Sequence, residues 1–301
     1  MARNSLFLYN KDSYMKILGK AAIGTVVVAL TAGALWFLLR NTGPRETIKG
    51  SSGTRIDIEE LSFYIKGDKV FGKVYRPVSD SLTRLPAVVV CHDIGRSADD
   101  CDALCRRIAD RGFIGYCFDF KGGSDYSRST GDPLAMSART EAEDIKGVLK
   151  ALRKVPYIKD SRVYLAGEGL GALSAAMAAA SDKALARALI LISPSVNIPD
   201  LSREMYPRMK DIPDTSEFQG MMVGKLFFKE IHDYKPFKKI GGYTGRTLVV
   251  HGTNDPFVDT ETVRATVDAY DDARLEVIKG GHSLMKSSPG PLADAIAGFL
   301  D

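Results

Sequence analysis

Four short segments of the sequence carry the side chains best suited to chemistry, and each follows an apolar run. They are CHDIG at residues 91–95, LAGEGLG at 165–171, HGTNDPFV at 251–258 and GGHS at 280–283. Histidine and carboxylate side chains can move a proton to or from a bound ligand when the fold brings them together. If the apolar runs are parallel strands, their carboxyl ends share one edge of the sheet, where ligands bind in such folds.

The elements around these segments alternate between strand and helix patterns. The continuous apolar run at 87–91 is typical of a strand buried on both faces. Further strands are expected at 113–118, 162–166, 188–192, 247–250 and 275–278, with helices at 99–110, 138–152, 169–180, 260–270 and 291–300. This alternation predicts an α/β protein with a doubly wound, mostly parallel sheet. Alternating residues on both sides of Gly67-Asp68 predict an antiparallel hairpin from 56–66 and 69–78.

Composition excludes several classes of protein. The chain has 301 residues, 45% hydrophobic and 26% charged, which is ordinary for a globular protein. A net charge of +4, from 41 basic and 37 acidic residues, is too balanced for a nucleic-acid binder, so we expect no nucleic-acid partner. Four cysteines without a Cys-x-x-Cys pair, only four histidines and no Gly-x-Gly-x-x-Gly in a suitable frame predict neither a metal nor a cofactor. Cys91 and Cys117 lie in strand-like runs and are expected to be small buried apolar groups.

The N-terminal region predicts a membrane anchor. Residues 21–39 form an uncharged run, which is close to the length that spans a bilayer, after a basic segment at 1–20. A cleaved signal peptide and a buried helix of the main domain are the alternatives. Positive charges on the two sides of the run are equal, so they do not orient it. The short N-terminus slightly favours a body outside the cytoplasm.

The rest of the chain divides into a linker and one large domain. Residues 40–55 are polar and glycine-rich and predict a linker, and residues 56–301 form the domain. The stretch 196–245 is too long for a plain connection, so we expect a small, mostly helical cap inserted there. Its apolar residues 221–228 are expected to serve packing rather than a substrate pocket, and His232 is expected at the surface.

The four segments together resemble the α/β-hydrolase fold superfamily. Within it the similarity is to cinnamoyl-ester hydrolases and to monoacylglycerol-lipase-like or lysophospholipase-like serine esterases, over about residues 56–300. The resemblance implies Asp255 as the triad acid and His282 as the triad histidine. His92, Asp93 and Gly95 match the oxyanion loop, where the family usually has glycine in place of Asp93. The oxyanion hole would then use the backbone N–H groups of Ile94 and Leu170. The turn at 118–122 resembles the family's Asp-x-Arg-Gly turn.

The nucleophile of this family is missing from the sequence. The elbow pattern Gly-x-Ser-x-Gly reads Gly167-Glu168-Gly169-Leu170-Gly171, so Gly169 stands at the serine position. Glu168 should point away from the elbow tip. Other serines, at 97, 174, 193 and 195, do not lie at the tip and are poor substitutes. We therefore expect a serine-hydrolase architecture without its nucleophile.

Three functions follow from this pattern. The first is a pseudoenzyme that binds a small ester or acyl ligand, or a protein partner, without hydrolysis. The second is a working esterase in which serine was replaced by Gly169 in this chain or allele. The third is a hydrolase in which water replaces the hydroxyl, with His282 and Asp255 as its base pair. We expect a space between Gly169 and His282. If the rest of the site is preserved, Gly169→Ser should restore measurable esterase activity, and its failure to do so would favour the pseudoenzyme.

Overall fold

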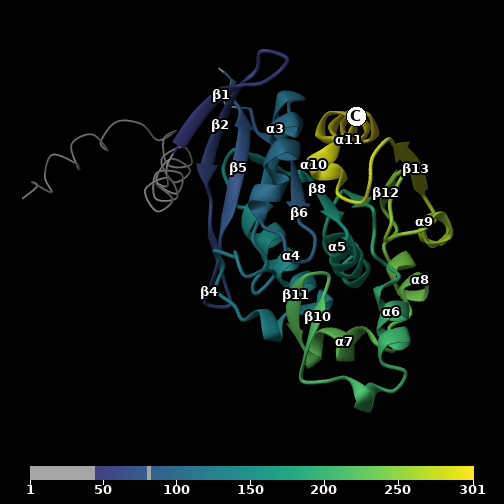
Figure 1. Ribbon diagram of the computed structural model, residues 1–301. Helices are drawn as coiled ribbons and strands as arrows, with labels where there is room; N and C mark the ends of the chain where they lie inside the picture. Colours follow the sequence, from purple (N-terminus) through teal and green to yellow (C-terminus); the bar gives the residue numbers. More distant parts are fainter. Residues whose placement is uncertain (1–44, 80–82) are drawn as a thin grey trace, which may run out of the picture. The chain divides into compact units, whose positions relative to one another are not determined.

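A nine-stranded sheet organises the residues that the computed structural model describes, 45–79 and 83–301 (Figure 1). The strand order is β1-β2-β5-β7-β6-β8-β9-β12-β13. Their bounds are β1 Arg45–Lys49, β2 Arg55–Glu60, β5 Gly72–Pro77, β6 Leu85–Cys91, β7 Ile114–Phe118, β8 Ile158–Glu168, β9 Ala188–Ile192, β12 Arg246–Gly252 and β13 Ala273–Ile278. The six strands from β7 to β13 in this order run parallel, and β1, β2 and β5 join antiparallel at one side. The predicted doubly wound, mostly parallel sheet is confirmed.

Helices cover both faces of this sheet. Their bounds are α3 Asp102–Asp110, α4 Ala138–Leu152, α5 Leu170–Ser181, α9 Thr260–Asp268, α10 Leu284–Ser287 and α11 Pro289–Leu300, with a short 3-10 turn, Ala98–Cys101, before α3. Residues of α3 and α11 share one core cluster with Val88, Val90 and Ile190 of the central strands. Helices α4 and α5 pack on each other, and α5 contacts β8 and β9, outside that cluster. The two helix layers therefore bury opposite faces of the central strands.

Helix α4 illustrates how local sequence determines an element. Ser137 caps its N-terminus by accepting a hydrogen bond from the Thr140 N–H at 3.2 Å, while the Thr140 hydroxyl accepts one from the Ser137 N–H at 2.9 Å. The apolar residues Ile145, Val148, Leu149 and Leu152 recur at helical spacing, and all four are buried. Their stripe faces the protein interior, as an amphipathic helix requires.

The N-terminal part differs from expectation in one respect. Residues 45–49, within the stretch where we expected a linker, form β1 and pair antiparallel with β2 from Arg45↔Glu59 to Lys49↔Arg55. The two arms expected for one hairpin, 56–66 and 69–78, each contain two strands. Next to Gly67, β3 (Phe63–Ile65) pairs antiparallel with β4 (Asp68–Val70), and farther out β2 pairs with β5. The expected anchor at 21–39 lies outside the described residues. Within 45–79 and 83–301, no helix is both long and apolar enough to cross a bilayer.

The insertion between β9 and β12 contains a β-hairpin as well as helices. Its helices are α6 Ile198–Met205, α7 Lys225–Ile231 and α8 Pro236–Lys239, and its hairpin joins β10 (Thr215–Phe218) to β11 (Met221–Gly224). The expected helical cap is therefore only partly helical. Gln219 and Gly220 both have positive φ, 51° and 81°, which suits a two-residue hairpin turn.

An aromatic cluster holds this cap together. The rings of Phe218, Phe227 and Phe228 contact one another with centroids 5.0–5.5 Å apart, and Tyr206 packs edge-on against Phe228. These apolar side chains serve packing, as predicted. His232 was expected at the surface, which is wrong. It is buried, with Nε2 2.9 Å from the Tyr206 carbonyl, because α7 places it against the chain that follows α6.

Candidate active site

The carboxyl ends of four parallel strands bring the predicted polar residues together. Asp93 follows β6, Gly169 follows β8, Asp255 follows β12 and His282 follows β13. Neighbouring parallel strands end at the same edge, so these four positions converge although they are far apart in sequence. This edge is the candidate active site.

Asp255 and His282 form a hydrogen-bonded pair. Nδ1 of His282 lies 2.8 Å from Oδ2 and 3.0 Å from Oδ1 of Asp255. The backbone N–H groups of Phe257 and Val258 also donate to Oδ1, at 2.9 and 3.1 Å. Burial opposes ionisation of Asp255, but the hydrogen bond from His282 and the two N–H groups lower its pKa. The Asp255 carboxylate therefore fixes His282 with its proton on Nδ1 and Nε2 facing the elbow.

Gly169 retains the backbone of a nucleophile elbow. Its backbone has φ 57° and ψ −120°, a conformation that residues other than glycine rarely adopt. Helix α5 begins at the next residue. Its N–H donates to the Ile192 carbonyl at 3.1 Å. A Cβ on Gly167 would overlap the Gly171 carbonyl, and one on Gly171 would overlap the His92 carbonyl. The spacing glycines are therefore required by the close approach of the loops.

Two backbone N–H groups converge beside Gly169, but a side chain of the protein already fills the hole they form. The N–H groups of Leu170 and Ile94 donate to Oδ1 of Asp93 at 2.7 and 2.8 Å. These are the two donors expected for an oxyanion hole. In such a hole the N–H groups stabilise the negative charge that develops during acyl transfer. Here both donors are already bound by the side chain of Asp93.

The same carboxylate also contacts the histidine. Oδ2 of Asp93 lies 3.3 Å from Nε2 of His282, so the imidazole sits between the carboxylates of Asp93 and Asp255. Burial alone would lower the pKa of His282, but the hydrogen bond of Asp255 and the charge of Asp93 raise it to about 10. His282 is consequently an imidazolium at neutral pH and has no free base on Nε2.

The space expected between Gly169 and His282 is occupied, which corrects the expectation from sequence. A Cβ at position 169 would overlap the Asp93 carboxyl group. A serine at this position therefore requires the Asp93 side chain to leave the hole. The Asp93 carboxyl group and a side chain at position 169 would therefore occupy the same space.

The remaining oxyanion-loop residues have structural roles. His92 is buried, its Nδ1 donates to the Asp93 carbonyl at 2.7 Å, and its Nε2 accepts from the Phe120 N–H at 3.2 Å. Burial lowers the pKa of His92, so it is neutral and holds the loop. Gly95 has φ 65°, and Met221 of the cap lies directly beside it.

Glu168 is a site residue whose environment was not foreseen. Its Oε1 accepts from the Met285 N–H at 2.8 Å, and the residue is 5% exposed. Burial raises its pKa to about 8, assisted by the nearby charge of Asp93. A cavity of about 10 Å³ lies among His92, Asp93 and Glu168, which is room for at most about one water molecule.

Within the part of the chain that the structure describes, no serine makes a polar contact with the His282 ring. There the polar contacts of the His282 ring are with Asp255 and Asp93. Ser174 instead donates to Glu141 at 2.7 Å, and Ser97 caps the turn before α3. Phe257 packs edge-on against the His282 ring at 5.2 Å.

The described residues contain no group of three or more His, Cys, Asp and Glu side chains arranged to hold a metal ion. All four cysteines are free and buried, as expected for Cys91 and Cys117. Asp119, in the turn at 118–122, accepts from the Ala98 N–H at 2.7 Å and pairs with Arg128 at 2.9 Å, so it braces the loops behind the site.

Sheet, helices and strand-end residues together define an α/β-hydrolase fold. A model of the prolyl oligopeptidase family matches residues 103–287, more than half of the chain. The chain therefore belongs to the prolyl oligopeptidase family. A search of curated proteins found no match.

Solved structures with the same fold are similar over most of this chain. Est1E from Butyrivibrio proteoclasticus, with ferulic acid bound, has a TM-score of 0.70 at 21% identity, covering 80% of this chain and 97% of that one. A hypothetical protein from Pseudomonas aeruginosa has a TM-score of 0.68 at 17% identity, covering 82% and 93%. The monoacylglycerol lipase of Paleococcus ferrophilus has a TM-score of 0.56 at 17% identity, covering 77% and 98%. At these identities the similarity shows the fold.

Proposed function

We propose that this chain is a pseudoenzyme of serine-esterase descent, held at a membrane by residues 21–39. The observation that carries the proposal is the Asp93 carboxylate, which accepts hydrogen bonds from Ile94 and Leu170 and contacts His282. A substrate carbonyl oxygen needs those two N–H groups in the transition state, and a nucleophile needs a neutral histidine. Asp93 withholds both, in addition to the missing serine. The protein then acts by binding an ester or acyl ligand or a protein partner.

The occupied hole argues against hydrolysis by an activated water. Such a mechanism requires His282 to accept a proton on Nε2, but the two flanking carboxylates keep it protonated. It also requires a place for the developing oxyanion, which Asp93 takes. Water-mediated catalysis therefore lacks both its base and its electrostatic stabilisation.

An active esterase carrying serine at position 169 is the second candidate. The positive φ of Gly169 and the preserved Asp255–His282 hydrogen bond favour it, because both suit a working triad. The position of Asp93 separates the two candidates. Under the pseudoenzyme proposal Asp93 blocks the site even when serine is restored.

The catalytic part of the proposal is tested on the full chain in detergent with a fluorophosphonate probe and a panel of aryl esters and thioesters. We expect no covalent adduct, and turnover equal to that of the His282→Ala variant. Labelling of the native chain, or turnover that His282→Ala abolishes, would contradict the proposal. Equilibrium dialysis with non-hydrolysable acyl analogues and cross-linking in membranes then distinguish a small ligand from a protein partner.

The anchor is tested by alkaline extraction of membranes from cells that express the full chain. We expect the native chain in the membrane pellet and a variant with Val28→Arg and Leu30→Arg in the supernatant, because each central arginine costs about 2.5–3.5 kcal/mol. Equal extraction of both chains would contradict the anchor. Digestion of the large domain by protease added to intact cells would support its placement outside the cytoplasm.

A further inference from the structure

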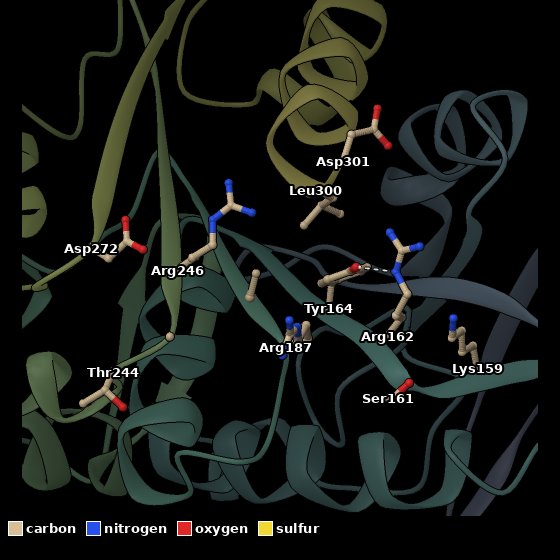
Figure 2. Close-up of a pocket in the computed structure, with 12 residues that line it drawn as sticks. Lys159, Ser161, Arg162, Tyr164, Arg187, Thr244, Arg246, Asp272, Leu300 and Asp301 are labelled. Atoms are coloured by element: carbon tan, nitrogen blue, oxygen red, sulfur yellow. Dashed lines mark hydrogen bonds between the residues drawn. The ribbon is translucent and has the colours of Figure 1, made fainter.

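A hollow lies at the edge of the sheet opposite the candidate active site, where parallel strands begin. Its volume is about 750 Å³, within the range of about 300–1,000 Å³ typical of small-ligand sites. It is lined by residues at the starts of β8, β9 and β12, together with the end of α11 (Figure 2). None of the residues at the candidate active site lines this hollow.

Three arginines from three neighbouring strands line it. Arg162 lies in β8, Arg187 directly precedes β9, and Arg246 begins β12. Backbone pairing places them beside one another at this edge, since the Arg187 N–H donates to the Val163 carbonyl at 2.8 Å and Arg246 pairs with Ala188. Alternation along the strands puts Arg162 and Arg246 on the face of Tyr164 and Ala188, and Arg187, level with Val163, on the other face. Figure 2 shows Arg162 and Arg246 on two sides of the hollow with Arg187 between them. Strand spacing places the outer two backbones about 10 Å apart.

These cations have no carboxylate partner. Within residues 45–79 and 83–301, Arg162, Arg187, Arg246 and the nearby Lys159 form no ion pair, whereas Arg76 and Arg128 each pair with a buried aspartate. Two of the arginines are nevertheless oriented. Arg246 stacks over the Phe299 ring at 4.5 Å, and Nε of Arg162 donates to the Tyr164 hydroxyl at 3.0 Å. Their free N–H groups stay available for an acceptor in the hollow.

The positive surface continues into a second hollow. This one has a volume of about 400 Å³ and shares Arg187, Ser161 and Thr244 with the first. It adds Arg153 and Lys183 to the basic lining, together with one acidic residue, Asp160. A ligand can therefore meet cations along an extended path rather than at a single point, which favours a ligand with several charges.

Two acidic side chains, Asp272 and Asp301, also line the larger hollow. Neither forms an ion pair among the described residues. They repel an anion from their part of the wall, so they limit where it can bind. Arg162, Arg187 and Arg246 line the remaining surface available to it.

We propose that this hollow binds an organic phosphate with at least two phosphate groups, contacted by Arg162, Arg187 and Arg246. The planar guanidinium forms two parallel hydrogen bonds with a phosphate. Three such groups spread over about 10 Å fit separated phosphates better than one. A free metabolite and a lipid headgroup present the same chemistry. The site is distinct from the candidate active site and does not depend on its activity.

The test is calorimetric titration of the full chain in detergent with pyrophosphate, inositol trisphosphate and dioctanoyl phosphatidylinositol bisphosphate. We expect saturable binding that weakens as salt increases, and a loss of about tenfold or more in affinity for Arg187→Gln and for Arg246→Gln. Tighter binding of the lipid than of inositol trisphosphate would identify a lipid source, and equal binding a soluble one.

Arg274→Gln is the matched control, because Arg274 is an exposed arginine of the adjacent strand β13 that pairs with Glu276 outside the hollow. Its affinity should equal that of the native chain. Asp272→Asn keeps every arginine and should tighten binding about threefold, which tests the site even if an arginine variant fails to fold. Absence of binding by all three probes would overturn the proposal. Equal affinities in native, Arg187→Gln and Arg274→Gln chains would overturn it as well.

Discussion

The carboxylate of Asp93 lies where a side chain at Gly169 would begin. A Cβ added at 169 would overlap this carboxyl group, and Oδ1 of Asp93 instead accepts a hydrogen bond from the Leu170 N–H at 2.7 Å. The two residues come from the ends of the adjacent strands β6 and β8 and depend on each other. The aspartate fits because the glycine has no side chain, and a side chain at 169 requires the Asp93 carboxyl group to move.

This dependence predicts coupling between the two positions in stability. Gly169→Ala places a side chain at φ 57° and against Asp93, so unfolding free energy should fall by more than the about 1–3 kcal/mol expected from backbone strain alone. In an Asp93→Gly background the same change should cost less. A double-mutant cycle from urea unfolding measures the difference, expected at about 0.5–3 kcal/mol. A coupling of zero would show that Asp93 does not occupy this space.

A second prediction concerns the charge on His282. Asp93→Asn keeps the shape of the side chain but removes its negative charge, so the pKa of His282 should fall from about 10. Nitrogen chemical shifts of the ring, followed by NMR against pH, report this directly. His92→Gln is a useful comparison for assigning signals, since burial keeps His92 neutral. An unchanged titration of His282 in Asp93→Asn would refute the proposed ion pair.

Glu168 and His282 make stability decrease toward alkaline pH. The folded-state pKa of Glu168 is raised to about 8 from 4.5, and that of His282 to about 10 from 6.5. Groups with raised pKa values stabilise the fold fully below the unfolded values, and lose this contribution as pH rises through the folded ones. Unfolding free energy should therefore fall between pH 4.5 and 8 through Glu168, and between 6.5 and 10 through His282.

Glu168→Gln isolates the first of these contributions. The amide keeps an acceptor for the Met285 N–H but cannot ionise, so the decline below pH 8 should become shallower. Urea unfolding at a series of pH values measures the slope. The same slope in the variant and the native chain would show that Glu168 titrates normally.

The aromatic cluster of the cap provides a stability prediction. Phe228→Ala removes a fully buried ring that contacts Phe218, Phe227 and Tyr206, and should reduce unfolding free energy by about 3–5 kcal/mol. Met222→Ala is the control, because Met222, in strand β11 of the same cap, is 48% exposed and should change stability by at most about 0.5 kcal/mol. Similar losses for both variants in thermal unfolding would show that the cluster does not anchor the cap.

The sequence was sufficient to predict the parallel strands of the sheet because apolar periodicity and buried runs reflect local structure. Helix α4 and strand β9 have the bounds that their patterns predicted. The hairpin β10–β11 was missed, although Gln219-Gly220 between two short runs is a turn signal. Strand β1 was missed because a short polar edge strand differs little from a linker in composition.

At the site, motif order correctly indicated that Asp255 and His282 lie close together. The position of the Asp93 side chain was not predicted, because it depends on the absence of a side chain at Gly169, 76 positions away (169 − 93). A signal was nevertheless present. Compared with the family motifs, this sequence has no side chain at Gly169 and an additional one at Asp93. The two residues follow strands that the fold places side by side. The three arginines of the hollow come together only because β8, β9 and β12 are neighbours in the sheet, and no local sequence pattern shows this strand order.

The most direct test of the account compares fluorophosphonate labelling of three chains in detergent: native, Gly169→Ser, and Gly169→Ser with Asp93→Gly. Only the double variant has a nucleophile, an empty oxyanion hole between Ile94 and Leu170, and a histidine that Asp93 no longer keeps protonated. We predict labelling of the double variant alone, and its loss when His282→Ala is added. Labelling of Gly169→Ser at the rate of the double variant would contradict the claim that Asp93 closes this site.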